Sequence, residues 1–137
     1  MVQDMNNGEH LEQRSLIKWC QYMEPIYTEL KWIFAIPNGG KRNIKTAMKL
    51  KAEGVKPGVS DLCLPVSRGE YHGLFIEMKY GKGKLTPSQI EFKEYLTSQR
   101  YCFYASWSWI DATKAIERYL NLTKEKTIRQ KTQERQP

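Results

Sequence analysis

Three charged residues stand in two stretches that otherwise have the composition of buried β-strands. Asp61 opens the stretch Asp61–Val66, and Glu77 and Lys79 close the stretch Leu74–Lys79. Side chains alternate between the two faces of a strand, so Glu77 and Lys79 lie on one face of theirs. Buried charges cost several kcal/mol each unless they are paired or hold a metal ion. The placement of these three charges in apolar stretches therefore needs a chemical explanation.

The segment between the two stretches suits a β-hairpin loop. It is Ser67–Gly73, with the sequence SRGEYHG, and its strands would pair antiparallel. In a bulge-free hairpin, any pairing whose facing residue numbers add to an even constant puts Asp61 on the face of Glu77 and Lys79. Each charge alone is better explained by a strand end near solvent or by an ion pair at a sheet edge. All three on one face favour a functional cluster.

Two neighbouring carboxylates and a lysine suit the hydrolysis of phosphate esters. Carboxylate oxygens make the hard site that Mg²⁺ or Mn²⁺ occupies together with waters and phosphate oxygens. A lysine two residues further on could orient the attacking water or hold the charge that develops on the phosphate. The chain has only two histidines, which argues against a Ser/His/Asp or Cys/His hydrolase, and GKGK lacks the spacing of a phosphate-binding P-loop.

The remaining elements must position this cluster, and their residue patterns predict them. Apolar residues at helical spacing predict helices over Gly8–Met23, Asn43–Glu53, Pro87–Ser98 and Ser108–Leu122. Aromatic and β-branched runs predict strands over Lys31–Ile36, Asp61–Val66, Leu74–Lys79 and Tyr101–Trp107. In the second helix, Ile44, Ala47 and Met48 form the expected inner stripe. A helix between the last two strands predicts a parallel crossover, so we expect an α/β fold, a small mixed sheet with helices on both faces.

The first predicted helix carries two acids that could complete the cluster. Glu9 and Glu12 extend the apolar stripe of this helix toward its N-terminus. Helical spacing does not separate them, because residues three apart lie on one face. The alternative is that both point to water and favour the helix dipole.

Composition bounds the class of protein. The chain has 137 residues and a net charge of +7, which suits one domain with a polyanionic partner such as nucleic acid. Its three cysteines form no CxxC or Cys/His cluster, so we expect core residues and no zinc site.

A polar start and no long apolar run predict a soluble intracellular protein. Residues 124–137 are basic and almost free of apolar side chains, which predicts a disordered tail.

The charged cluster resembles a known nuclease signature. Asp61 followed 16 residues later by Glu77-Met78-Lys79 is similar to the D…(D/E)xK pattern of the PD-(D/E)xK nuclease superfamily. The runs IPNGGKRN, LKAEGVKPGVSDLCLPVSRGEYHGLFIEMK and LTPSQIEF closely resemble the VRR-NUC (virus-type replication-repair nuclease) family, in its small stand-alone form from phages and bacteria. The resemblance covers roughly Glu9–Leu120. It implies a restriction-endonuclease-like core and a VRR-NUC nuclease domain over residues 1–123.

The resemblance also implies roles for single residues. Asp61 and Glu77 would be metal ligands together with the Met78 carbonyl, and Lys79 would be the catalytic lysine. Gln89, in LTPSQ, matches a glutamine that helps to position the active site.

The resemblance bears on two more positions. The helix acid of the family falls in an E-x-x-x-Q pattern, which is met here by Glu9 and Gln13. Glu9 is thus the expected further catalytic residue and metal ligand, with Glu12 still a competitor. Ser60 stands where the family usually has proline, a residue that sets backbone geometry and supplies no ligand.

The function expected from the resemblance is a Mg²⁺- or Mn²⁺-dependent DNA endonuclease of the bacterial cytoplasm, encoded by the host or by a phage. Relatives of this size resemble Holliday-junction resolvases and act as homodimers on branched DNA in repair. The expected contacts to the phosphate backbone are Lys41, Arg42, Lys45, Lys82 and Lys84. The alternatives are a non-catalytic nucleic-acid-binding module and a restriction-type endonuclease that cuts linear duplex.

Overall fold

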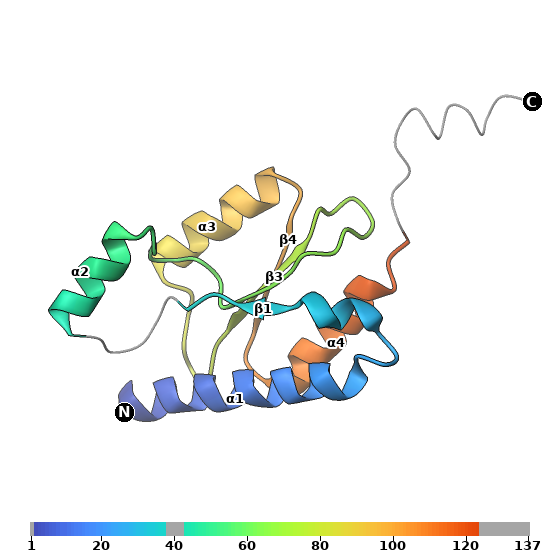
Figure 1. The fold of residues 1–137 in the computed structure, drawn as a ribbon, viewed down its shortest axis with the longest axis horizontal. Helices are drawn as coiled ribbons and strands as arrows, with labels where there is room; N and C mark the ends of the chain where they lie inside the picture. Colours follow the sequence, from blue (N-terminus) through green and yellow to red (C-terminus); the bar gives the residue numbers. More distant parts are fainter. Residues whose placement is uncertain (1, 38–42, 124–137) are drawn as a thin grey trace, which may run out of the picture.

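The computed structural model describes residues 2–37 and 43–123, and these form a four-stranded sheet with helices on both faces (Figure 1). Residues 38–42 and the expected tail, residues 124–137, lie outside the described residues. In chain order the elements are α1 (Val2–Met23), the 3₁₀ helix η1 (Thr28–Trp32), β1 (Phe34–Ala35), α2 (Ile44–Ala52), β2 (Leu62–Leu64), β3 (Leu74–Met78), α3 (Pro87–Ser98), β4 (Cys102–Ser106) and α4 (Trp109–Leu120).

The sheet has the order β1-β2-β3-β4 and mixes two kinds of pairing. β2 pairs antiparallel with β3 in the register Leu62↔Ile76 and Cys63↔Phe75, with no bulge between them. β3 pairs parallel with β4 through the α3 crossover, and Glu77 lies opposite Ala105. The predicted α/β fold, the hairpin and the parallel crossover are all confirmed.

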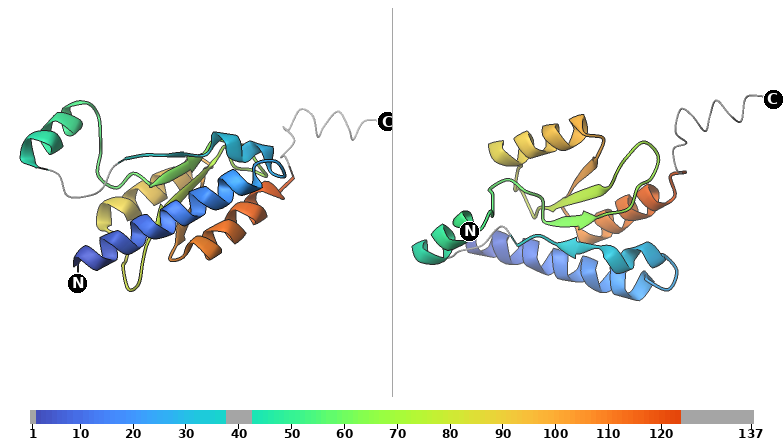
Figure 2. Two further views of the ribbon diagram at one scale, coloured as in Figure 1. Left: turned by 60° about the horizontal axis from the view of Figure 1, so that its bottom comes forward. Right: turned by 45° about the horizontal axis from the view of Figure 1, so that its top comes forward.

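The main core lies between the sheet and the pair α1 and α4 (Figure 2). The alternate residues of β3 with side chains on this face are Leu74, Ile76 and Met78, all at most 2% exposed. They pack with residues such as Leu16 of α1 and Ile116 of α4. This core fixes the hairpin against the helix that carries Glu9 and Glu12.

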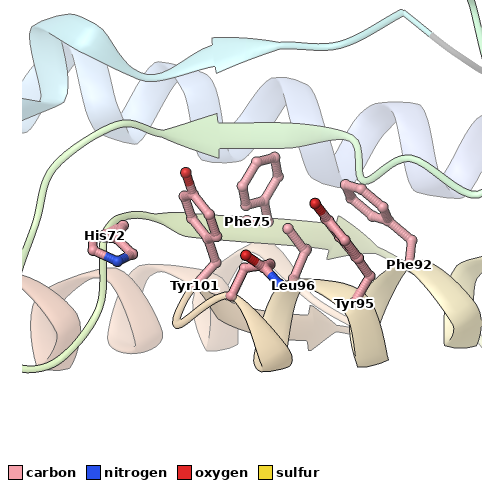
Figure 3. Close-up of a pocket in the computed structure, with 7 residues that line it drawn as sticks. His72, Phe75, Phe92, Tyr95, Leu96 and Tyr101 are labelled. Carbon is pink, nitrogen blue, oxygen red and sulfur yellow. The ribbon is translucent and has the colours of Figure 1, made fainter.

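The opposite face of the sheet is covered by α3 through aromatic contacts (Figure 3). The Phe75 ring meets the rings of Phe92 and Tyr101 edge-on, at centroid distances of 5.7 and 5.6 Å. These residues line an open cavity of about 570 Å³ together with His72, Tyr95, Leu96 and Gln99. By strand alternation Glu77 lies on the same face as Phe75.

Helix α3 begins where its sequence predicts. The Thr86 hydroxyl accepts a hydrogen bond from the Gln89 N–H, and the Gln89 side chain accepts one from the Thr86 N–H. With Pro87 in the first turn, this is a complete capping box.

The predicted strand Lys31–Ile36 is wrong over its first half. Lys31 and Trp32 belong to η1, and the pairing of this segment in the sheet begins only at Phe34. The composition is typical of a strand, but η1 packs against α1 and buries Leu30 to 3% exposure. A tertiary contact here overrides the local preference.

The predicted inner stripe of α2 is also wrong. The helix exists, and Asn43 caps it by accepting the Thr46 N–H at 2.7 Å. None of its residues is buried, however, and Ile44 and Met48 are 78% and 67% exposed. Figure 1 shows the helix standing apart from the sheet. No helix in the described ranges is long and apolar enough to cross a membrane.

Candidate active site

The hairpin brings Asp61 and Glu77 together. The register of β2 and β3, continued by one residue, sets Asp61 opposite Glu77. A carboxylate oxygen of Asp61, Oδ2, accepts a hydrogen bond from the backbone N–H of Met78 at 2.7 Å. The Asp61 side chain is thereby fixed at the end of β3, beside the residues that the sequence singles out.

Glu77 lies in an environment that disfavours its negative charge. The residue is 3% exposed, and its Oε1 atom has no hydrogen-bond partner among the described residues. The pKa of Glu77 is raised to about 10, mainly by burial and then by the hydrogen bond to Asp61 and the negative charge of that residue. The positive charge of Lys79 opposes this rise with a smaller effect. A bound cation would supply the partner that this buried carboxyl oxygen lacks.

Lys79 is buried beside these acids. It is 7% exposed, and its backbone N–H donates to the Ser106 carbonyl at 2.7 Å, which continues the β3–β4 pairing. Its positive charge acts to lower the pKa of both Glu77 and Glu9. The ammonium group therefore lies close to both acids.

The structure separates the two helix acids. Glu9 lies near Lys79 and Asp61: burial raises its pKa, the charge of Lys79 opposes that rise, and the charge of Asp61 adds to it. Glu12 instead accepts the backbone N–H of Trp109 at 2.7 Å and so caps the start of α4. Glu9 therefore lies close to Asp61 and Lys79, whereas Glu12 has a structural partner elsewhere.

Gly8 allows α1 to reach the site. This glycine is buried inside a helix, and a Cβ built on it would lie 2.3 Å from the Tyr80 ring. Tyr80 follows Lys79 directly, so the absent side chain lets the helix lie against the end of β3. Sequence reasoning missed this contact, although a glycine next to a candidate acid inside a predicted helix was the available signal.

Asp61 is held by a second close approach. Gly58 has a positive φ of 88°, and a Cβ on it would lie 2.4 Å from the Ser88 carbonyl oxygen. The segment before β2 is thus pressed onto the start of α3. Ser60 follows with 0% exposure and a hydroxyl that has no partner among the described residues.

Gln89 lies at the start of α3, where its side chain completes the capping box. Its carbonyl oxygen is therefore occupied by the Thr86 N–H. Any role of Gln89 in positioning the site would pass through the amide nitrogen or through the cap itself.

The expected DNA-contacting residues are only partly described. Lys41 and Arg42 lie outside the described residues. Lys45 is exposed on α2, and Lys82 and Lys84 are exposed on the loop between β3 and α3. That loop is tied to the β4–α4 turn, because the Trp107 indole N–H donates to the Gly83 carbonyl at 2.7 Å.

The donor set suits a cation that keeps several water ligands. In the described ranges, no three His, Cys, Asp or Glu side chains are gathered closely enough to hold a metal ion by themselves. Asp61, Glu77 and the Met78 carbonyl come from adjacent backbone, and Glu9 faces them from α1. Mg²⁺ is typically held by one or two carboxylates together with waters and substrate oxygens, so the residues present fit it.

The comparisons with known proteins agree with this architecture. A solved structure described as a VRR_NUC domain protein is similar over 85% of this chain and 90% of its own, with a TM-score of 0.70 and 28% sequence identity. Among curated proteins, none matches the chain. The family model of the VRR-NUC domain matches residues 5–106. That match covers the described acids, the lysine and all four strands, and this protein therefore belongs to the VRR-NUC family and contains a nuclease-type DNA-processing domain.

Proposed function

We propose that this protein is a Mg²⁺- or Mn²⁺-dependent endonuclease that hydrolyses DNA phosphodiester bonds, with a preference for branched DNA such as Holliday junctions. The observation that carries the proposal is Oε1 of Glu77, a buried carboxyl oxygen with no partner in the described structure, next to Asp61 and Lys79. A fold without a cation or substrate would gain nothing from this arrangement, because it disfavours the ionised carboxyl.

The residues of the site would have different roles in hydrolysis. A water oxygen forms a bond to phosphorus while the bond to the leaving sugar oxygen breaks, and the water loses a proton as the leaving oxygen gains one. Asp61, Glu77 and the Met78 carbonyl would hold the metal, with Glu9 as a further acid. When bound, the metal would lower the pKa of water and neutralise charge on the phosphate. The Lys79 ammonium would orient the water or hold a phosphate oxygen.

Binding of the substrate rests on exposed lysines. Lys45 is exposed on α2, and Lys82 and Lys84 are exposed on the loop that follows Lys79. Contacts from such lysines would hold the DNA backbone without reading its sequence. On a junction, a homodimer would present two active sites and cut two strands symmetrically. Such an enzyme would act in DNA repair in the bacterial cytoplasm.

Cleavage of matched DNA substrates tests the proposal. Wild-type protein is incubated with a four-way junction, a flap, a nicked duplex and an intact duplex, each with Mg²⁺, with Mn²⁺ and with EDTA. We expect metal-dependent cleavage that is fastest on the junction, with paired cuts placed symmetrically. Asp61→Ala and Lys79→Ala should abolish cleavage, whereas Lys114→Ala, at an exposed lysine of α4, should leave it unchanged.

Each alternative predicts a different result. If Asp61→Ala or Lys79→Ala cleaved DNA at the wild-type rate, the assignment of the active site would be wrong. Binding of junctions without cutting in either metal would identify a non-catalytic module. A fixed cut sequence in linear duplex would identify a restriction-type enzyme.

A further inference from the structure

Helix α2 has an exposed apolar edge. Ile44 and Met48 are four residues apart and so lie on the same side of the helix. They are 78% and 67% exposed, and no residue of α2 is buried. Figure 1 and the left view in Figure 2 show the helix apart from the sheet and from the other helices. Among the described residues none buries this edge, which points to an external partner as the reason for it.

The charge of α2 indicates which partner fits. Lys45 and Lys49 each follow one of the two apolar residues and form a parallel row, and Lys51 adds a third cation. The helix contains no acidic residue. A two-fold contact between copies of the chain would bring these lysine rows toward each other, which like-charge repulsion opposes. A polyanion that also exposes apolar surface satisfies both features.

Unstacked bases of DNA are such a partner. DNA-bending proteins insert apolar side chains such as Ile and Met between base steps, and their cations hold the adjacent phosphates. Asp61 follows the end of α2 at Ala52 by nine residues, and the intervening segment is held against α3 at Gly58. The helix also lies at the end of the molecule where α1 begins (Figure 1), and Glu9 is in the N-terminal part of α1.

We propose that the Ile44–Met48 edge of α2 inserts at the branch point of DNA, where bases are already unstacked, while Lys45 and Lys49 hold the flanking phosphates. The inference rests on the proposed function, because it explains how a nuclease of this size would distinguish a branch from a plain duplex. Inserting a side chain costs least where stacking is already lost, so the apolar edge would favour branched DNA. The lysines would strengthen binding to any DNA.

Binding without cleavage tests the proposal. Affinities for a synthetic four-way junction and for a duplex of the same arm sequence are measured in EDTA, with the fluorescent base 2-aminopurine at the branch. Ile44→Ala/Met48→Ala should lower the preference for the junction by about tenfold, leave duplex affinity within about twofold, and abolish the rise in 2-aminopurine fluorescence. Lys45→Ala/Lys49→Ala should weaken binding to both DNAs and lower the salt slope by about two.

The controls separate this inference from its alternatives. Ile26→Ala changes an equally exposed apolar residue after α1 and should behave as wild type. The proposal is overturned if wild type shows no junction preference, or if the apolar double variant keeps both the preference and the fluorescence rise. Loss of a dimer in sedimentation with an unchanged DNA preference would assign the edge to self-association and also overturn it. A wild type that cleaves no DNA in either metal would refute the endonuclease proposal and leave this binding test intact.

Discussion

Glu9 and Glu12 lie one helical turn apart on α1, and the structure gives them different partners. Glu9 is close to Lys79 and Asp61, whereas Glu12 accepts the Trp109 N–H at the start of α4. Residues three apart share a helix face, so periodicity alone leaves both as candidates. The deciding contact joins residues 97 positions apart in the chain, which no local pattern reveals.

Exchange of each acid for its amide should separate the two roles. Glu9→Gln should lower the cleavage rate by about a hundredfold or more, since it removes a carboxylate that would help to hold the metal, and should not destabilise the fold. Glu12→Gln should keep most activity and destabilise the fold by about 1 kcal/mol, since it weakens the cap of α4. Single-turnover cleavage and thermal unfolding measure the two effects. The reverse pattern would assign the site to Glu12.

Glu77 should make the metal-free protein less stable as the pH rises. Its pKa is raised from the ordinary 4.5 to about 10 in the fold. Between these two values the folded protein keeps a proton that the unfolded chain has released, so a rise in pH favours unfolding. The contribution of Glu77 is complete below about pH 4.5 and is lost as the pH approaches 10.

Glu77→Gln should remove this pH dependence. In EDTA at pH 8, the variant should be more stable than wild type by about 1 kcal/mol, which for a domain of this size is a melting temperature about 4 °C higher. The same variant should not cleave DNA. Thermal unfolding from pH 5 to pH 9 measures the slope, and an equal slope in both proteins would contradict the assigned environment of Glu77.

At the scale of elements, the fold was largely predictable and the contacts between elements were not. The hairpin, the parallel crossover and the start of α3 at Pro87 follow from local sequence patterns. The hairpin register continued to Asp61 supports the sequence expectation that this acid shares a face with Glu77. The stripe of α2 was misjudged because amphipathic spacing does not say whether another element lies within reach. The strand over Lys31–Ile36 was misjudged because η1 packs against α1.

The contact between α1 and the end of β3 should control activity through Gly8. Gly8→Ala would introduce a methyl group where the Tyr80 ring lies, and α1 would have to move away from Lys79. We expect at least a tenfold loss of cleavage rate, even though alanine favours a helix over glycine by about 1 kcal/mol. Steady-state cleavage should show the loss mainly in kcat.

A compensating variant tests the cause. Gly8→Ala/Tyr80→Ala removes the ring and should recover most of the rate that Gly8→Ala loses. Gln21→Ala, an exposed position on the same helix, is the control and should have no effect. A double variant as slow as Gly8→Ala would show that the close approach is not what places Glu9.

At the scale of the whole molecule, divalent metal and folding should be linked through the acids. A cation that binds only the folded state stabilises it by about 2.7 kcal/mol at a hundred times its Kd. Mg²⁺ or Mn²⁺ should therefore raise the melting temperature of wild type above its value in EDTA. Asp61→Asn should lose most of this increase. Equal increases in both proteins would place the metal elsewhere.

The loop between β2 and β3 ties together parts of the chain that are far apart in sequence. Arg68 donates to the Leu120 carbonyl and pairs with Glu29, and the Gly69 N–H donates to the Thr123 carbonyl. The Tyr119 hydroxyl donates to the Val66 carbonyl at 2.6 Å in the same region. These bonds join the hairpin loop to η1 and to the end of α4.

Amide hydrogen exchange should therefore be uneven along the molecule. The amides bonded across the hairpin loop and the end of α4 should open only with global unfolding, whereas those of α2 should exchange through local opening. The hairpin that carries Asp61 and Glu77 would then be anchored at its loop end as well as at the end that carries the acids. A DNA ligand held by α2 would slow exchange in that helix and leave the anchored hairpin loop unchanged.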